Sequence, residues 1–160
     1  MGFGKIKRLT ADKHMSDALR RSANWTCQLT DKDYSDNPQG LQLSHFIARG
    51  NWAVRFDPKN VLVLSAWAHK KMEGHPVHHI NLWREIHGGI YGRHESDAEL
   101  NALLGRSECK SRAQYARANH AKIGKHYLAI VKELDGLTEE EIEEYEIHPP
   151  IYRDQAPFLT

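Results

Sequence analysis

Apolar and polar positions in the middle of the chain change their spacing twice, and these changes predict three elements. Residues 41–47 alternate apolar with polar side chains, and residues 60–64 form a short β-prone run, so each segment favours a strand. A helix-compatible stretch that carries His69 follows them. Turn-forming residues separate the two strands: Gly50, Asn51, Asp57 and Pro58. The pattern predicts strand, long loop, strand and helix as a core at about residues 41–74.

The remaining sequence predicts additional helices on both sides of this core. They are expected near residues 11–23, 77–87, 95–104, 110–134 and 138–146. The last of them follows Thr138, whose hydroxyl group is typical of a helix N-cap. The 160 residues, 40% of them hydrophobic, can bury one core. We therefore expect a single α+β domain over 1–160, with a helical C-terminal part at about 77–146 and an extended tail at 147–160.

Three polar residues mark the predicted core: His45 ends its first strand, Asn60 opens its second strand, and His69 lies on its helix. With these residues, the segment resembles the HNH, or ββα-metal, endonuclease superfamily, and within it the phage recombination nucleases of the NinG and Rap kind. The resemblance is strongest over residues 16–90, where "DALRRSANWTC", "LSHFIARGNWAVRFDPKNVLVL" and "GHPVHHINLWREIHGG" follow one another in the family's order. It implies a ββα-metal core hairpin and helix surrounded by additional α-helices.

The resemblance also implies a metal-dependent DNA endonuclease, phage-encoded and acting in recombination or DNA processing. Phosphodiester hydrolysis needs a base for water, and a neutral imidazole with a pKa of roughly 6.5 suits that task. It also needs a cation beside the phosphoryl oxygens. We assign His45 to the base and His69 to the metal, and expect the two imidazoles to converge on one small volume. Asn60 either holds the loop and the His45 ring by hydrogen bonds or offers its carbonyl oxygen to the ion.

Further metal ligands are sought next to His45 and His69. Many relatives place Asp or His immediately before the base, where this chain has Ser44, a poor ligand. Glu73 follows His69 by one helical turn, so both side chains face the same way. The alternative for Glu73 is a solvated helix charge paired with Lys70 or a neighbour. We expect one divalent ion, Mg²⁺ first and Mn²⁺, Ni²⁺ or Zn²⁺ as alternatives, with water in the remaining positions.

Structural zinc is not expected. Relatives of the NinG kind carry two cysteine pairs that form a four-cysteine zinc site. This chain keeps Cys27 alone, and Thr30, Ser65 and Ala68 stand at the other positions. Two cysteines in total and no secretory segment fit a reducing compartment, so we expect a cytoplasmic protein, in the host cytoplasm if it is phage-encoded.

The net charge of +1 hides an uneven distribution of charged residues. Residues 1–26 and 106–132 are basic, and either contact phosphates or form ordinary solvated helix faces. Arg49 and Arg55 lie in the loop between the strands, within reach of a phosphate at His45, although Arg55 alternatively pairs with Asp57. DNA is the expected partner. No membrane partner is expected, because no apolar run approaches the roughly 20 residues of a bilayer span.

The acidic predicted helix at 138–146 leaves several alternatives open: it repels DNA, covers a basic groove until substrate arrives, or binds a protein partner. Two other functions therefore stand beside the nuclease. One is a catalytically degenerate HNH domain that binds nucleic acid or a partner. The other is a regulatory interaction protein that uses the acidic helix as its surface. The histidines at positions 75, 78 and 79 are assigned a structural or incidental role.

Overall fold

A computed structural model describes residues 6–87 and 93–149, and its centre is a two-stranded antiparallel hairpin. Strand β1 (Leu41–His45) pairs with β2 (Val61–Ser65), so that Leu41 lies opposite Ser65 and His45 opposite Val61. Helix α2 (Ala66–Glu73) follows β2 directly. The Ser65 hydroxyl group caps this helix by accepting a hydrogen bond from the Ala68 N–H at 3.2 Å. The predicted α+β class and the order strand, loop, strand, helix are confirmed.

The remaining helices are α1 (Thr10–Ser22), α3 (Pro76–His87), α4 (Arg93–Ser107), α5 (Lys110–Leu134) and α6 (Glu139–Glu143). Their positions agree with the prediction, but α4 is longer than the predicted 95–104 and α6 is shorter than the predicted 138–146. Thr138 caps α6 as expected, since its side chain accepts from the Glu141 N–H and Glu141 bonds back to the Thr138 N–H. Only the first turn gains from the helix dipole, and glutamates one turn apart repel each other, so the helix ends early.

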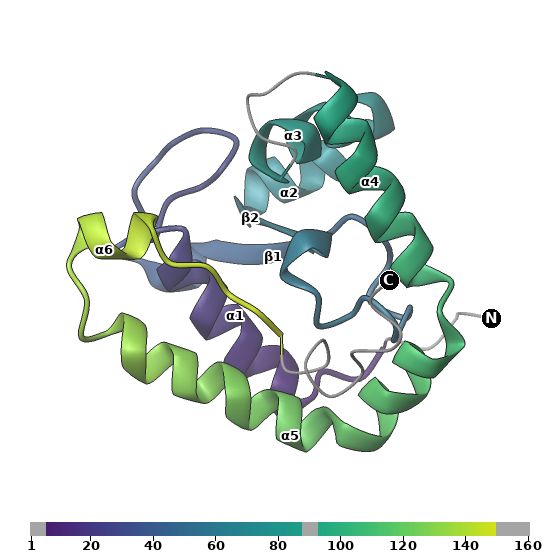
Figure 1. The fold of residues 1–160 in the computed structure, drawn as a ribbon. Coiled ribbons are helices and arrows are strands. Elements are labelled where there is room, and N and C mark those ends of the chain that lie inside the picture. Colours follow the sequence, from purple (N-terminus) through teal and green to yellow (C-terminus); the bar gives the residue numbers. More distant parts are fainter. Residues whose placement is uncertain (1–5, 88–92, 150–160) are drawn as a thin grey trace.

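The hairpin lies between two groups of helices: α1 and α5 cover one face, and α2 and α3 lie on the other (Figure 1). Side chains alternate along a strand, so Leu41, Leu43 and His45 share the face toward α1. Gln42 and Ser44 share the opposite face, toward α2. This alternation places consecutive candidate residues, Ser44 and His45, on different sides of the hairpin.

Helices α1 and α5 pack side by side and close the core beneath β1 (Figure 1). A Cβ atom on Gly124 of α5 would lie only 3.1 Å from the Ala11 Cα of α1, so a glycine is needed where the two helices meet. The buried Tyr127 of α5 donates its hydroxyl hydrogen to the Phe56 carbonyl oxygen at 2.6 Å. Helix α5 therefore supports both α1 and the loop between the strands.

Two expectations concern the ends and the environment of the chain. The predicted tail at 147–160 lies mostly outside the described residues, which end at Pro149. Residues 147–149 are not helical, and Pro149 is buried. Within residues 6–87 and 93–149, no helix combines the length and the apolar character that crossing a bilayer requires.

Candidate functional site

His45 is held by the loop that separates the two strands. Its Nε2 atom lies 3.1 Å from the Arg55 carbonyl oxygen. A carbonyl only accepts hydrogen bonds, so Nε2 carries the proton and Nδ1 keeps its lone pair. Burial lowers the pKa of His45 to about 4, although the Arg55 carbonyl and the Asp12 carboxylate act in the opposite direction. The ring is therefore neutral at pH 7, with Nδ1 able to accept a proton.

Asn60 fixes the path of the same loop. It is fully buried, and its Oδ1 accepts a hydrogen bond from the Ile47 N–H at 2.7 Å. Its Nδ2 donates to the carbonyl oxygens of Ile47 at 2.9 Å and Val54 at 3.1 Å. Val54 immediately precedes Arg55, whose carbonyl oxygen holds His45. The Asn60 side chain thus has the geometry of the loop-holding alternative, and its carbonyl oxygen is already engaged with Ile47.

Arg55 is buried in an ion pair with α1. Its Nε and Nη2 atoms lie 3.1 and 2.6 Å from the two carboxylate oxygens of Asp12, and the two residues are 1% and 8% exposed. Burial alone would raise the pKa of Asp12, but the Arg55 hydrogen bonds hold it below its usual value. The guanidinium also lies 4.4 Å from the centre of the Trp52 ring. This position differs from the exposed phosphate contact expected for Arg55, and here the side chain stabilises the loop.

The alternative pairing of Arg55 with Asp57 is wrong, because Asp57 has other partners. The Nε atom of Arg106 lies 2.8 Å from the Asp57 carboxylate, and Nη2 of Arg112 lies 3.7 Å away. Both Asp57 and Arg112 are buried. The basic stretch at 106–132 is therefore divided, since these two arginines point inward. Its exposed members lie on α5: Lys110, Arg117, Lys122, Lys125 and Lys132.

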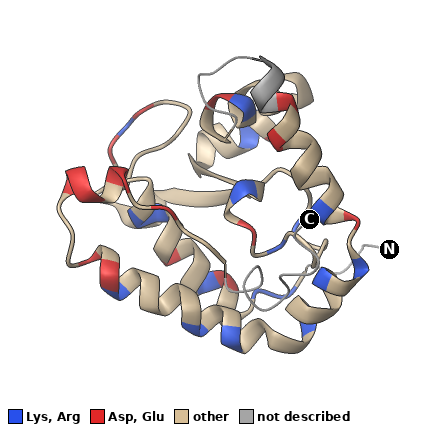
Figure 2. Cartoon of the chain, in the orientation of Figure 1, with Lys and Arg blue, Asp and Glu red and all other residues tan. Residues whose placement is uncertain are grey.

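A groove of about 850 Å³ runs between α1 and β1. Its walls include His45 and the cations Arg8, Lys13, Arg20 and Arg49. Two carboxylates also line it, but Asp12 is paired with Arg55, and Asp17 lies 2.6 Å from Arg20. Among the described residues, no carboxylate pairs with the other groove cations, and the Arg49 side chain donates to the Ile6 carbonyl at 2.6 Å. The groove beside His45 is therefore positively charged, whereas acidic residues gather at α6 (Figure 2).

His69 lies on the other face of β1, next to Glu73. Its Nδ1 atom is 2.9 Å from the Gln42 side-chain oxygen, and its Nε2 atom is 3.1 Å from a Glu73 carboxylate oxygen. Gln42 has a donor and an acceptor, so it supports either tautomer of the ring. Glu73 pairs with His69 rather than Lys70, and its side chain is 67% exposed. Ser44, on the same face of β1, is 1% exposed.

The sequence predicts that the two imidazoles converge on one small volume, and among the described residues they make no direct contact with each other. His45 is bonded to the Arg55 carbonyl oxygen, and His69 lies beside Gln42 and Glu73. Strand alternation places His45 and Gln42, the partner of His69, on opposite faces of β1. β1 is an edge strand of the two-stranded sheet. A phosphate along its free edge is therefore the kind of ligand that side chains from both faces can reach.

The 3.1 Å between His69 Nε2 and the Glu73 carboxylate oxygen is the distance of a hydrogen-bonded pair. It is also close to the roughly 3.0 Å between neighbouring octahedral ligands that each lie about 2.1 Å from an ion. Water would occupy the remaining positions. Within the described residues, no group of three or more His, Cys, Asp or Glu side chains is arranged to hold a metal ion.

His79 of α3 is a residue whose surroundings the sequence did not reveal. Its ring packs edge-on against Phe46, with ring centres 5.2 Å apart, and its buried Nε2 has no hydrogen-bond partner among the described residues. Burial lowers its pKa, His69 lowers it further, and Glu73 opposes this effect. His79 therefore borders the pair formed by His69 and Glu73. In the sequence, the position of His79 in the first helical turn after Pro76 was the available indication that it lies near the start of α3.

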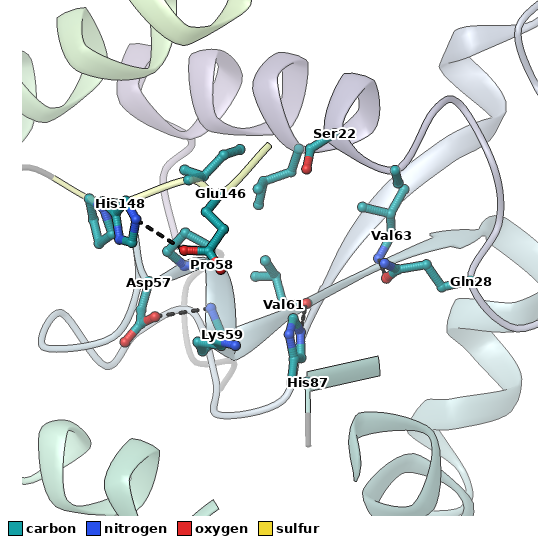
Figure 3. Close-up of a pocket in the computed structure, with 14 residues that line it drawn as sticks. Ser22, Gln28, Asp57, Pro58, Lys59, Val61, Val63, His87, Glu146 and His148 are labelled. Carbon is teal, nitrogen blue, oxygen red and sulfur yellow. Dashed lines mark hydrogen bonds and ion pairs between the residues drawn. The ribbon is translucent and has the colours of Figure 1, made fainter. Parts of the chain in front are cut away.

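A second cavity, of about 300 Å³, lies beside the outer edge of β2 (Figure 3). His87 Nε2 donates to the Val61 carbonyl oxygen at 2.6 Å, and the Gln28 side-chain oxygen accepts from the Val63 N–H at 2.7 Å. Burial lowers the pKa of His87 to about 4. These side chains cover the outer edge of the hairpin, which is a structural task.

Comparisons of the chain with protein-family models, with curated proteins and with solved structures found no match. The functional argument for this chain therefore rests on the chemistry of its own side chains. The strongest features are the fixed ring of His45, the basic groove beside it, and the donor pair of His69 and Glu73.

Proposed function

We propose that this protein is a metal-dependent DNA endonuclease in which His45 is the general base. The observation that carries the proposal is the position of His45 in the wall of a basic groove, with Nε2 committed to the Arg55 carbonyl and Nδ1 left as an acceptor. A positively charged groove attracts the phosphate backbone, and an oriented neutral imidazole is suited to removing a proton from water.

In the proposed reaction, cations of the groove bind the phosphates on either side of the scissile bond. Arg8, Lys13 and Arg49 are the side chains suited to this contact. Nδ1 of His45 takes a proton from water, the water oxygen forms a bond to phosphorus, the bond to the 3′ oxygen breaks, and the departing 3′ oxygen takes a proton from solvent water. The nearby phosphate charge favours the imidazolium that forms, and so raises the pKa of His45 when substrate is bound.

His69 and Glu73 are the residues that would hold a divalent ion. Such an ion supplies charge that offsets the negative charge developing on the phosphoryl oxygens. Gln42 orients the His69 ring through its Nδ1 atom, which leaves Nε2 and the Glu73 carboxylate facing each other. In the Nδ1–H tautomer, Nε2 and the carboxylate are both acceptors, and a proton or a metal ion between them relieves their repulsion.

A second candidate function is a DNA-binding module that no longer cleaves. The observation that favours it is the buried serine at position 44, which leaves two protein donors for the ion. The basic groove serves both functions equally well. The two candidates differ only in whether bound DNA is hydrolysed when a divalent ion is present.

The experiment that separates them is incubation of supercoiled plasmid with the purified protein and Mg²⁺, Mn²⁺, Ni²⁺ or Zn²⁺ in turn. We expect nicked or linear plasmid with at least one ion, and intact plasmid when EDTA is added. DNA binding is measured on the same samples by gel shift. Binding without cleavage under every ion would select the binding module, and loss of both would refute a nucleic-acid function.

A further inference from the structure

Segment 6–12 is bonded to the loop that holds His45. Arg49 donates to the Ile6 carbonyl at 2.6 Å, and Arg55 donates to the Lys7 carbonyl at 2.9 Å. The strongest of these contacts is the bidentate ion pair between Arg55 and Asp12, with distances of 2.6 and 3.1 Å. The carbonyl oxygen of the same Arg55 lies 3.1 Å from His45 Nε2. A continuous set of polar contacts thus runs from α1 to the candidate base.

We propose that Asp12 is a positioning residue for His45. Its carboxylate fixes the Arg55 side chain, and this holds the Arg55 carbonyl where it selects the Nε2–H tautomer and the ring orientation of His45. The inference rests on the proposed function, because it gives the base its orientation. It adds a residue from α1, outside the hairpin and the helix that carry the candidate site.

Asp12 pairs with Arg55 and stabilises the loop, although its position opposes the binding of phosphates. It lines the basic groove, where a carboxylate opposes the binding of phosphates. Its hydrogen bond with the Leu9 N–H, at 2.7 Å, supports only the start of α1. Asp12 also faces His45 closely enough to raise that ring's pKa, whereas Arg49 and Arg55 lower it. The negative charge therefore acts against substrate binding and in favour of the proton transfer.

This opposition gives Asp12→Asn a distinctive signature. Removal of the charge makes the groove more positive, so DNA affinity measured in EDTA stays the same or becomes tighter. The single-turnover cleavage rate at saturating protein falls about 10-fold to 100-fold, because a small displacement of a catalytic group has an effect of that size. Asp135→Asn is the matched control. Asp135 follows α5, lies outside the groove, and pairs at 2.6 Å with Arg21, which is on α1 like Asp12. Its rate and affinity stay at wild-type values.

A second variant controls for loss of stability caused by the unpaired charge. Asp12→Asn leaves the Arg55 charge buried without its partner, whereas Asp12→Asn combined with Arg55→Gln removes both charges. The double variant is expected to show the same loss of rate as Asp12→Asn. A wild-type rate in a folded double variant would overturn the positioning role.

Nitrogen NMR of the His45 ring provides a readout that does not depend on cleavage. The wild-type ring is expected in the Nε2–H tautomer, and both variants should show a mixture of tautomers. An unchanged tautomer in both variants would refute the role of Asp12, whatever their activity. If the wild-type protein cleaves no DNA but the tautomer responds to Asp12, the proposed function fails and the positioning role stands.

Discussion

The two faces of β1 differ in how completely the chain organises their polar groups. On the α1 face, His45 is bonded to a loop that Asn60 and Arg55 hold by buried hydrogen bonds. On the α2 face, His69 Nε2 lies 3.1 Å from a carboxylate oxygen of Glu73, and the two side chains are 25% and 67% exposed. One face is fixed by folding, whereas the other presents two donors one helical turn apart.

We therefore assign a different chemical task to each face of β1. A general base acts efficiently only when its ring is already oriented, so a rigid loop suits His45. A metal ion orders its own ligands, so a partly exposed donor pair suffices for His69 and Glu73. Substitutions on the α1 face should therefore change stability and rate, and substitutions on the α2 face should change metal affinity.

The largest expected effect is on the α1 face, at Asn60. Asn60→Ala leaves the Ile47 N–H and the Ile47 and Val54 carbonyls without their partner. The free energy of unfolding should fall by about 3 to 5 kcal/mol, because each buried unsatisfied group is unfavourable by about 1–3 kcal/mol. Urea denaturation measures it. Asn51→Ala, in the same loop but only partly buried, is the control, with a loss of about 1 kcal/mol. Equal losses would show that Asn60 has no special role.

Acid should also destabilise the fold through His45 and His87. Both have a pKa of about 4 when folded, below the roughly 6.5 of an unfolded chain, so the unfolded state binds more protons between these values. Stability therefore falls as pH falls through this window, by about 2 kcal/mol per histidine between pH 7 and pH 5. Denaturation at both pH values tests this. His87→Gln should remove about half of the dependence, and an unchanged dependence would contradict the burial of His87.

Metal affinity tests the α2 face alone. His69→Ala and Glu73→Gln should each weaken Mn²⁺ binding at least about 10-fold in calorimetry, with the folded stability nearly unchanged. Glu99→Gln, an exposed glutamate on α4, is the matched control. If Mn²⁺ binds both variants as tightly as wild type, the ion is held elsewhere and the α2 face has no metal-binding role.

The smallest effects should come from single cations of the groove. Arg8→Ala and Lys13→Ala should each reduce the salt slope of DNA binding by about 1, because each removes one phosphate contact. Lys32→Ala is the control, since Lys32 is exposed and lies outside the groove. Titration of labelled duplex at several salt concentrations measures the slope. A change for Lys32 as large as that for Arg8 would place the DNA elsewhere.

Local patterns predicted the hairpin, α2 and most helix boundaries, because strand alternation and helical periodicity depend on near neighbours. They also indicated the loop-holding role of Asn60 as one of two alternatives. The partner of Arg55 could not be predicted in this way, since Asp12 is 43 residues away and Asp57 is only two. Tertiary packing decides such pairings. The same limit applies to His79, whose neighbours depend on how α3 packs beside α2.

The surroundings of His45 and His69 show a related limit of the sequence. Both residues belong to one short unit, but they have different partners in the structure. Alternation along β1 sends Gln42 toward His69 and His45 toward α1. The register of a single strand thus determines which face of the hairpin each candidate group occupies.

The most direct test of the central claim compares His45→Gln with His87→Gln and wild type on the same DNA. Both histidines are partly buried, both donate Nε2–H to a carbonyl, and glutamine keeps a donor but cannot act as the base. We expect His45→Gln to bind DNA as wild type does and to cleave at least about 100-fold more slowly, and His87→Gln to cleave at the wild-type rate. Cleavage by His45→Gln at the wild-type rate would contradict the assignment of His45 as the base.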